Sequence, residues 1–311
     1  MKNIVIFDDY SEKDLKPPAL LREYVELTER DVREMLVPAA ALRVPCPACL
    51  SPDVASTFEK FGLTYAECAS CGTLYVTPRP CDSGLDRYDR ESSARRFWRE
   101  ELAPGSGAAR REKIVKPRGE WVVDSTREHL PGAKLCADIG TAQSTYIDEI
   151  AAEGLFDRVV RDALFERADV VTLFEVADRT SDVDALFARA RAMLGERGLA
   201  FVTAILVSGF DLQMLWDRAD NIFPPDRLNV FSVDGLKTLT ARHGFEPIEF
   251  STPGILDVEI VAAALERDPS LPVPRWARYL LSREEHTRRD FQRFLQSELL
   301  SSYGRVVLTT V

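Results

Sequence analysis

Four cysteines near the N-terminus constrain the fold more than any other feature of this sequence. They form two C-x-x-C pairs, Cys46 with Cys49 and Cys68 with Cys71, which residues 50–67 separate. Pairs at this spacing are typical of a four-thiolate zinc site, in which each pair supplies two ligands from one tight turn. Four thiolates complete the tetrahedron and leave no position for water, so the sequence predicts a structural zinc site rather than a catalytic one.

Composition limits the compartment and the partners. The N-terminal segment MKNIVIFDDYSEKD has only a short apolar run followed by acids, and no run in the sequence is long enough to span a membrane. We therefore expect a cytoplasmic protein without a membrane partner, where disulfides are disfavoured and Cys81 and Cys136 serve as small apolar side chains. The formal net charge of -10 argues against nucleic-acid binding, which requires a basic surface. The sequence gives no indication of the oligomeric state.

Patterning along the chain predicts four parts. These are an N-terminal helical arm (1–45), the zinc ribbon (46–80), a helical connector (81–132) and an α/β domain (133–311) with a helical insertion (255–302). Basic and aromatic residues interleave in the connector, but acids are mixed in with them. We interpret it as a connecting region, and lining of a substrate cleft is the less favoured alternative.

The α/β domain is predicted from alternating strand and helix patterns. The expected strands are KLCADIG, ADVVTLFEV, LAFVTAILV, FEPIEFST and RVVLTTV. ADVVTLFEV is a largely apolar run of the kind found in buried parallel strands. The expected helices include DVDALFARARAML and FSVDGLKTLTARHG, the second with Ser232 as its N-cap and Gly244 at its C-terminal end.

Several segments in succession resemble a known family. CPAC, FEKFGLTYAECASCGTLYVTPRP, DIGTAQS, DVVTLFEV, PPDRLNVFS and GFEPIEFSTPGILDVEIV occur in this order from about residue 20 onward. Together they resemble a bacterial group of class I S-adenosylmethionine-dependent methyltransferases with an N-terminal zinc ribbon. The resemblance implies a Rossmann-like, mostly parallel sheet with one antiparallel strand, here RVVLTTV, and some relatives act on sugars or other small metabolites.

The resemblance also implies a set of cofactor-binding residues. Asp138, Gly140 and Ala142 match the acidic residue and small-residue loop after the first strand, although Ala142 stands where a glycine is usual. Glu175 matches the acid that ends the fourth strand, but no histidine follows it. Asp162 stands at about the distance expected for the acid that binds the cofactor's ribose.

The segment between the first strand and ADVVTLFEV is short for this family. If FDRVV is a strand, about seven residues lead to the next strand, whereas parallel crossovers normally take a dozen or more. Apolar residues at Leu155, Phe156, Val159 and Val160 have helical spacing. We therefore favour one helix over Thr145–Glu166, continuous or broken at Gly154, with the second and third strands of the family fold absent and the sheet reduced.

Two functional hypotheses remain. The first is a small-molecule methyltransferase, acting on a sugar or a sugar nucleotide, with Phe223, Asp226, Arg227 and Asn229 facing the substrate. In the competing interpretation of these four residues, the loop NIFPPDRLNVFS only packs on the sheet. The second hypothesis is a degenerate, non-catalytic relative that acts as a binding or scaffold protein, which the short cofactor half and the missing histidines favour.

Overall fold

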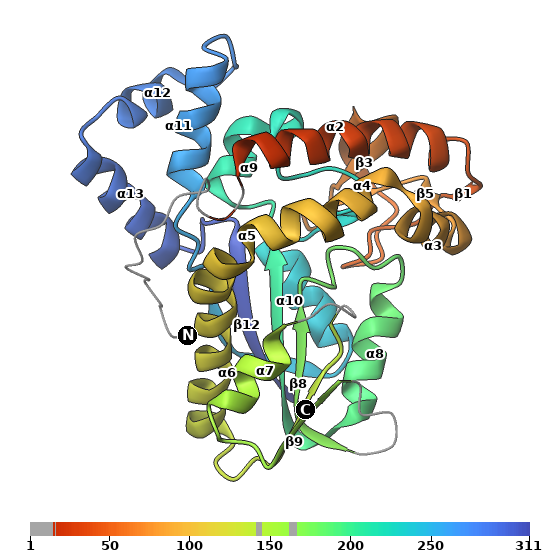
Figure 1. The fold of residues 1–311 in the computed structure, drawn as a ribbon, viewed down its shortest axis with the longest axis vertical. Helices are drawn as coiled ribbons and strands as arrows, with labels where there is room; N and C mark the ends of the chain where they lie inside the picture. The colour runs from red at the N-terminus through yellow and green to blue at the C-terminus, as the bar shows by residue number, and fades with distance from the viewer. Residues whose placement is uncertain (1–14, 16, 141–144, 162–166) are drawn as a thin grey trace.

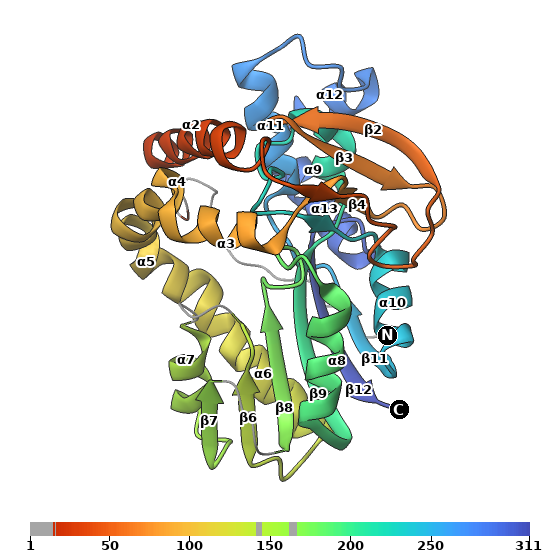
Figure 2. The same cartoon turned by 90° about the vertical axis from the view of Figure 1, so that its right-hand side faces the viewer.

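A six-stranded mixed sheet forms the lower half of the molecule as drawn in Figure 2. The computed structural model describes residues 15, 17–140, 145–161 and 167–311. The pairs β6–β7, β6–β8 and β8–β9 are parallel, whereas β12 runs antiparallel to both β9 and β11. In spatial order the strands are β11 (Phe245–Ser251), β12 (Tyr303–Thr310), β9 (Leu194–Ile205), β8 (Ala168–Phe174), β6 (Leu135–Asp138) and β7 (Arg158–Arg161).

Helices cover both faces of this sheet (Figure 1). Along β8, Val170 and Phe174 pack with Trp121 on one face, while Val171 and Leu173 pack on the other. A parallel strand buried on both sides has to be apolar along its whole length, which explains the run ADVVTLF. The first face carries α6 (Lys116–His129) and α7 (Tyr146–Ala152), and the second carries α8 (Val183–Met193) and α10 (Val233–Arg242).

The cysteine segment forms a second, antiparallel sheet of order β10–β4–β3–β2. β2 and β3 form a hairpin whose turn has positive φ at Phe61 and Gly62. β10 comes from the α/β domain, so the two parts share one sheet. The strands are β2 (Val54–Lys60), β3 (Leu63–Cys68), β4 (Leu74–Val76) and β10 (Asn229–Val230), and β1 (Ala41–Leu42) pairs separately with β5 (Arg79–Pro80).

A series of helices lies across the carboxyl ends of the central parallel strands (Figure 2). Two short π-helical segments, η1 and η2, join α5 to its neighbours and lead into α6. In chain order the elements are α2 (Pro18–Met35), α3 (Asp82–Glu91), α4 (Ser93–Phe97), η1 (Trp98–Leu102), α5 (Ala103–Arg110) and η2 (Arg111–Val115).

Two further helical groups flank the same edge of the sheet. The first group is α9 (Phe210–Leu215) with the 3-10 turn η3 (Trp216–Arg218), and the second is α11 (Asp257–Arg267), α12 (Arg275–Leu281) and α13 (Glu285–Ser297). The second group is the predicted insertion before the last strand, and it forms a lobe at the upper left of Figure 1.

The predicted α/β fold class is confirmed. RVVLTTV lies in the antiparallel strand β12, and the other four predicted strands are present as β6, β8, β9 and β11. The Ser232 hydroxyl caps α10 by accepting a 2.8 Å hydrogen bond from the Gly235 backbone N–H. In the part of the chain that the structure describes, no helix combines the length and apolar character needed to cross a membrane.

The predicted helix over Thr145–Glu166 is wrong. α7 ends at Ala152, Gly154 has a φ of +68°, and Arg158–Arg161 form β7 beside β6. Strand pairing satisfies the backbone of this segment and overrides the helical spacing of its apolar side chains. Because β7 is only four residues long, it extends about 13 Å, and the chain needs only a short connection to return to the start of β8. The second strand of the family fold is therefore present, and a third has no counterpart among the described residues.

Candidate functional site

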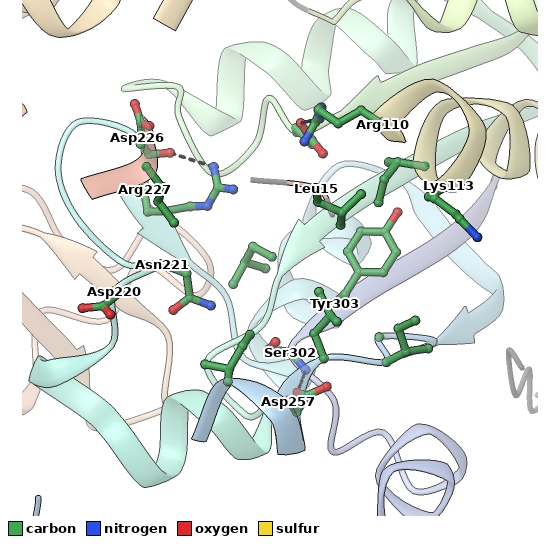
Figure 3. Close-up of a pocket in the computed structure, with 18 of the residues that line it drawn as sticks. Leu15, Arg110, Lys113, Asp220, Asn221, Asp226, Arg227, Asp257, Ser302 and Tyr303 are labelled. Carbon is green, nitrogen blue, oxygen red and sulfur yellow. Dashed lines mark hydrogen bonds and ion pairs between the residues drawn. The ribbon is translucent and has the colours of Figure 1, made fainter. Parts of the chain in front are cut away.

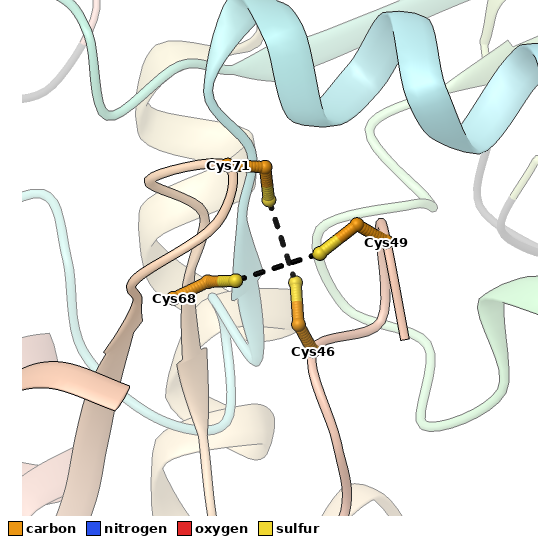
Figure 4. Close-up of side chains that lie close together, drawn as sticks. All are labelled: Cys46, Cys49, Cys68 and Cys71. Carbon is orange, nitrogen blue, oxygen red and sulfur yellow. Dashed lines mark hydrogen bonds between the residues drawn. The ribbon is translucent and has the colours of Figure 1, made fainter. Parts of the chain in front are cut away.

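The four cysteines predicted to bind zinc converge in the ribbon (Figure 4). The Sγ atoms of Cys46 and Cys71 lie 3.6 Å apart, and those of Cys49 and Cys68 lie 3.5 Å apart. Bonds of about 2.3 Å from a tetrahedral zinc ion place the sulfur atoms roughly 3.8 Å apart, so the cluster fits this ion. Burial raises the pKa of the Cys46 thiol, and a bound cation would offset this by favouring the thiolate.

The ribbon also holds a loop of the α/β domain, residues 220–228, which precedes β10. The Tyr65 hydroxyl of β3 donates a 2.5 Å hydrogen bond to the Arg227 carbonyl. The Ser232 hydroxyl donates to the carbonyl of the zinc-site residue Cys71. The pairing of β10 with β4 and these two hydrogen bonds, one before β10 and one after it, therefore connect the loop to the ribbon that contains the four cysteines.

A cleft of about 800 Å³ opens at the carboxyl end of β8, beside the start of α7, and we term it the sheet-edge cleft. Its floor includes Tyr146 at the start of α7 and Phe174 with Glu175 at the end of β8. Helices α3 to α5 provide the facing wall. Five arginines line the cleft, namely Arg95, Arg99, Arg110, Arg111 and Arg179.

Asp138 ends β6 and is almost fully buried, with an exposed fraction of 1%. Its Oδ1 accepts hydrogen bonds from the Thr172 hydroxyl at 2.7 Å and from the Gly140 N–H at 3.3 Å. Its Oδ2 is buried without a hydrogen-bond partner among the described residues. A Cβ at position 140 would lie 3.1 Å from Oδ1, so glycine suits this turn. The predicted cofactor residues Ala142 and Asp162 lie outside the described residues.

Glu175 follows β8 with a φ of +56° and faces the sheet-edge cleft. Its carboxylate accepts from the Arg118 guanidinium at 2.8 Å and lies 3.8 Å from Arg110. Burial alone would raise the pKa of Glu175, but these two arginines hold it well below its ordinary value. Glu175 is therefore a fixed negative charge at neutral pH.

Arg118 organises the polar groups behind this carboxylate. Its side chain is 4% exposed, it donates to the Tyr146 hydroxyl as well as to Glu175, and its guanidinium lies 4.7 Å from the centre of the Tyr303 ring. Burial would lower the pKa of Arg118, but the surrounding tyrosines and Glu175 raise it above its ordinary value. The buried cation is thus compensated by an ion pair and by aromatic faces.

A smaller cavity of about 210 Å³, the inner cavity, adjoins the cleft (Figure 3). Its walls include Tyr24 of α2, Lys113 of η2, Phe223 of the loop, Asp257 of α11 and Tyr303 of β12. Residues that line both the inner cavity and the sheet-edge cleft are Trp98, Arg110, Glu175 and Arg179. The two spaces therefore meet at the carboxyl end of β8.

Three of the four predicted substrate residues line the inner cavity: Phe223, Asp226 and Arg227. Asp226 accepts 2.7 Å contacts from the Tyr24 hydroxyl and from the Arg95 guanidinium. Burial would raise the pKa of Asp226, but Arg95 lowers it to about 2. Asp226 is therefore ionised and engaged by these partners.

Asn229 lies outside both cavities. Its amide donates to the carbonyls of Ala177 and Thr180 at 2.9 Å, and its oxygen accepts from Arg79 at 2.6 Å. These bonds join the ribbon to the segment after β8. For Asn229, this arrangement agrees with the interpretation in which the loop only packs on the sheet. The other three predicted substrate residues face the inner cavity.

Sequence reasoning missed the side chains that join the two cavities. Arg118 and Tyr303 were not singled out, and Arg110 and Trp98 were placed in a connector whose favoured interpretation was structural. The interleaved basic and aromatic residues of the connector were the available signal. Tyr303 and Asn221 carried no signal of their own, because only the folded chain brings them to the cavity.

Comparison with known proteins found one matching family model and a number of similar solved structures. Residues 97–249 match a family model described as a methyltransferase domain. A solved amino pentose methyltransferase of calicheamicin biosynthesis from Micromonospora echinaspora is 13% identical, with a TM-score of 0.38, over 68% of this chain and 97% of that chain. An O-methyltransferase from the trans-AT PKS multienzyme of Brevibacillus brevis is 15% identical, with a TM-score of 0.37, over 67% of this chain and 76% of that chain.

A plantazolicin methyltransferase is 10% identical, with a TM-score of 0.43, over 73% of this chain and 93% of that chain. Among curated proteins, none matches the sequence. The matched family model spans the central strands β6 to β9 and the helices that pack on them. With a mixed sheet whose last strand in the chain, β12, is antiparallel to its neighbours, this match shows that the chain carries a class I S-adenosylmethionine-dependent methyltransferase domain, preceded by a small β region with a four-cysteine cluster.

Proposed function

We propose that this protein is an active methyltransferase that transfers a methyl group from S-adenosylmethionine to a small molecule, a sugar or a sugar nucleotide being the class that its resemblance suggests. The observation that carries the proposal is the junction of the two cavities at Trp98, Arg110, Glu175 and Arg179. A methyl donor in the outer space and an acceptor in the inner one would meet there. Alignment of the two reactants is the main contribution that this geometry would make to the rate.

The sheet-edge cleft fits the cofactor in position and in chemistry. It opens where the parallel strands end, which is where ligands bind in open α/β sheets. The buried Asp138 Oδ2, which has no hydrogen-bond partner among the described residues, is an acceptor that lies three residues before the loop at 141–144 in the sequence. We propose Asp138, Gly140, Ala142, Asp162 and Glu175 as the cofactor-binding set. S-adenosylmethionine would supply an electrophilic methyl group on a sulfonium centre, and the fixed charge of Glu175 would favour that cation.

On the acceptor side, the chain's own residues would orient the small molecule and exclude water. Phe223 provides an apolar wall, and Asp226 and Arg227 provide polar groups that the ribbon and α2 hold in place. Zinc in the four-cysteine site would have a structural role, because it would fix the backbone of this loop. In this proposal the helical arm (1–45), the ribbon (46–80) and the connector (81–132) all serve the α/β domain (133–311).

Calorimetric titration with S-adenosylhomocysteine tests the proposal directly. We expect micromolar binding to the zinc-loaded protein. In a second titration with S-adenosylmethionine, Glu175→Gln should weaken binding by about tenfold or more, because the carboxylate charge that would favour the sulfonium is lost. Glu285→Gln on α13 is the matched control, since this glutamate is 68% exposed and pairs with Arg289. Absence of binding to the wild-type protein would overturn the proposal.

The scaffold hypothesis has one structural observation in its favour. The edge strand β7 has no further strand beside it among the described residues, so one wall of the cofactor region is shorter than in the complete family fold. If the protein is a non-catalytic scaffold, it would bind neither S-adenosylhomocysteine nor an acceptor. The same titration therefore decides between the two functions.

A further inference from the structure

Two buried arginines flank the ring of Tyr303, and their surroundings differ. Arg118 and Arg305 lie 4.7 Å and 5.7 Å from the ring centre. Arg118 is neutralised by Glu175. Arg305 is 8% exposed, yet no carboxylate of the described residues lies within ion-pair distance of it. Its Nε is buried without a hydrogen-bond partner among them.

An unpaired buried cation is costly, because water is removed and no opposite charge replaces it. Partial compensation comes from the rings of Trp121 and Tyr303, with the Trp121 ring centre 5.2 Å from the guanidinium. Aromatic faces contribute much less than an ion pair with hydrogen bonds. A group of this kind is expected to have a partner that is not among the described residues.

The inner cavity gives such a partner access. Arg305 lines it together with Tyr303, whose buried hydroxyl also lacks a partner among the described residues, and with Lys113. Figure 3 shows Tyr303 and Lys113 on the same side of the cavity, opposite Asp226 and Arg227. On that opposite side Asp226 is paired with Arg95, so its charge is already balanced.

We propose that the wall formed by Arg305, Tyr303 and Lys113 binds an anionic group, a carboxylate or a phosphate, carried by the methyl acceptor. The assignment of the anionic group to the methyl acceptor rests on the proposed function, whereas the anion site itself does not. The planar guanidinium can donate two parallel hydrogen bonds to either anion. The Tyr303 hydroxyl can donate a third.

Stability without any ligand gives the first test, measured by urea unfolding in Tris chloride buffer. Arg305→Gln should raise the urea midpoint, because it removes an unpaired buried charge. Arg289→Gln, at an arginine 59% exposed on α13, should leave the midpoint unchanged. A lower midpoint for Arg305→Gln would mean that Arg305 has a structural role and would overturn the proposal.

Anion binding gives the second test, with inorganic phosphate and acetate as probes and chloride at equal ionic strength as the reference. Tryptophan fluorescence should change saturably with at least one probe, since Trp121 lies against Arg305. Arg305→Gln should weaken that binding by about tenfold or more, and Arg305→Lys should retain part of it. A response to phosphate alone would identify a phosphorylated acceptor, and a response to acetate alone would identify a carboxylic acid.

Parallel titration with S-adenosylhomocysteine separates this proposal from the previous one. If the cofactor product binds but neither anion does, the anion site is overturned and the methyltransferase proposal stands. If an anion binds through Arg305 but the cofactor product does not, the anion site stands and the methyltransferase proposal fails. An equal response of wild type and Arg305→Gln to both anions would also overturn the anion site.

Discussion

At the scale of single residues, the site is a set of buried charges whose partners come from distant parts of the chain. Glu175 follows β8 and is held by Arg118 of α6 and Arg110 of α5. Asp226 is held by Tyr24 of α2 and by Arg95 of α4. Each carboxylate is thereby ionised and fixed in orientation, so removal of one partner should be felt in stability.

Arg118→Met should lower the free energy of unfolding by about 2 kcal/mol, because Glu175 loses its closest cation and Tyr146 loses a donor. Urea unfolding measures the difference. Arg127→Met on the same helix is the matched control, since Arg127 is 53% exposed and pairs with Asp124 three residues earlier. That variant should differ from wild type by less than about 0.5 kcal/mol. Equal effects of the two substitutions would refute the buried-pair interpretation.

Lys60 gives a pH-dependent prediction. Its ammonium donates to the carbonyls of Ala219 at 2.5 Å and Asp217 at 3.2 Å, and burial lowers its pKa to about 8 from an ordinary value of 10.5. Between these values the unfolded chain binds more protons than the folded one, so the free energy of unfolding rises with pH across this window.

Lys60→Met removes this titration. The wild-type stability minus that of the variant should increase from pH 8 to pH 10.5, by at most about 3 kcal/mol. Urea unfolding of both proteins across this pH range gives the difference in their free energies of unfolding. Both proteins contain the same cysteines, so the effects of cysteine titration cancel in this difference. A constant difference would show that the Lys60 pKa is not lowered in the folded protein.

At the scale of elements, the strand β10 links the metal cluster to the acceptor side of the proposed site. Residues 220–228 are followed directly by β10, which pairs with β4 of the ribbon. The Val76 N–H donates a 2.9 Å hydrogen bond to the Leu228 carbonyl just before this pairing begins. The loop that carries Phe223 and Asp226 thus depends on an element that the cysteines hold.

Removal of zinc with a chelator should therefore expose this loop. Hydrogen exchange at amides of residues 223–231 should accelerate, because β4 loses its support and the hydrogen bonds of β10 open. Amides of β12 (Tyr303–Thr310), buried between β9 and β11, serve as the internal control and should keep their protection. Unchanged exchange in 223–231 would show that the ribbon holds its form without a metal.

At the scale of the whole molecule, the shared strand predicts that the ribbon and the α/β domain unfold together. Zinc release, followed with a colorimetric chelator, should have the same urea midpoint as the loss of tryptophan fluorescence. The physical reason is that opening either part removes strand pairs and packed side chains from the other. Release of zinc at a clearly lower urea concentration would mean that the ribbon is an independent unit.

The fold class could be predicted from the sequence because its strands are long apolar runs with clear helical intervals. β7 could not, since four residues at a sheet edge carry little pattern and their pairing with β6 decides their structure. The cysteine cluster was predicted from its spacing, whereas the roles of Arg118 and Tyr303 were not predicted. Their roles depend on contacts between residues such as Arg118 and Glu175, which local patterns do not encode.

The pairing of β10 with β4 also fixes the order in which the protein can be completed during synthesis. The cysteines and β4 leave the ribosome long before β10, because residues 77–228 must be made in between. At ordinary elongation rates this takes on the order of ten seconds. During that time the outer edge of β4 is an open strand edge that other chains could pair with. The nascent ribbon could thus capture its metal well before the loop that it will support exists, and the inner cavity would be among the last parts of the molecule to close.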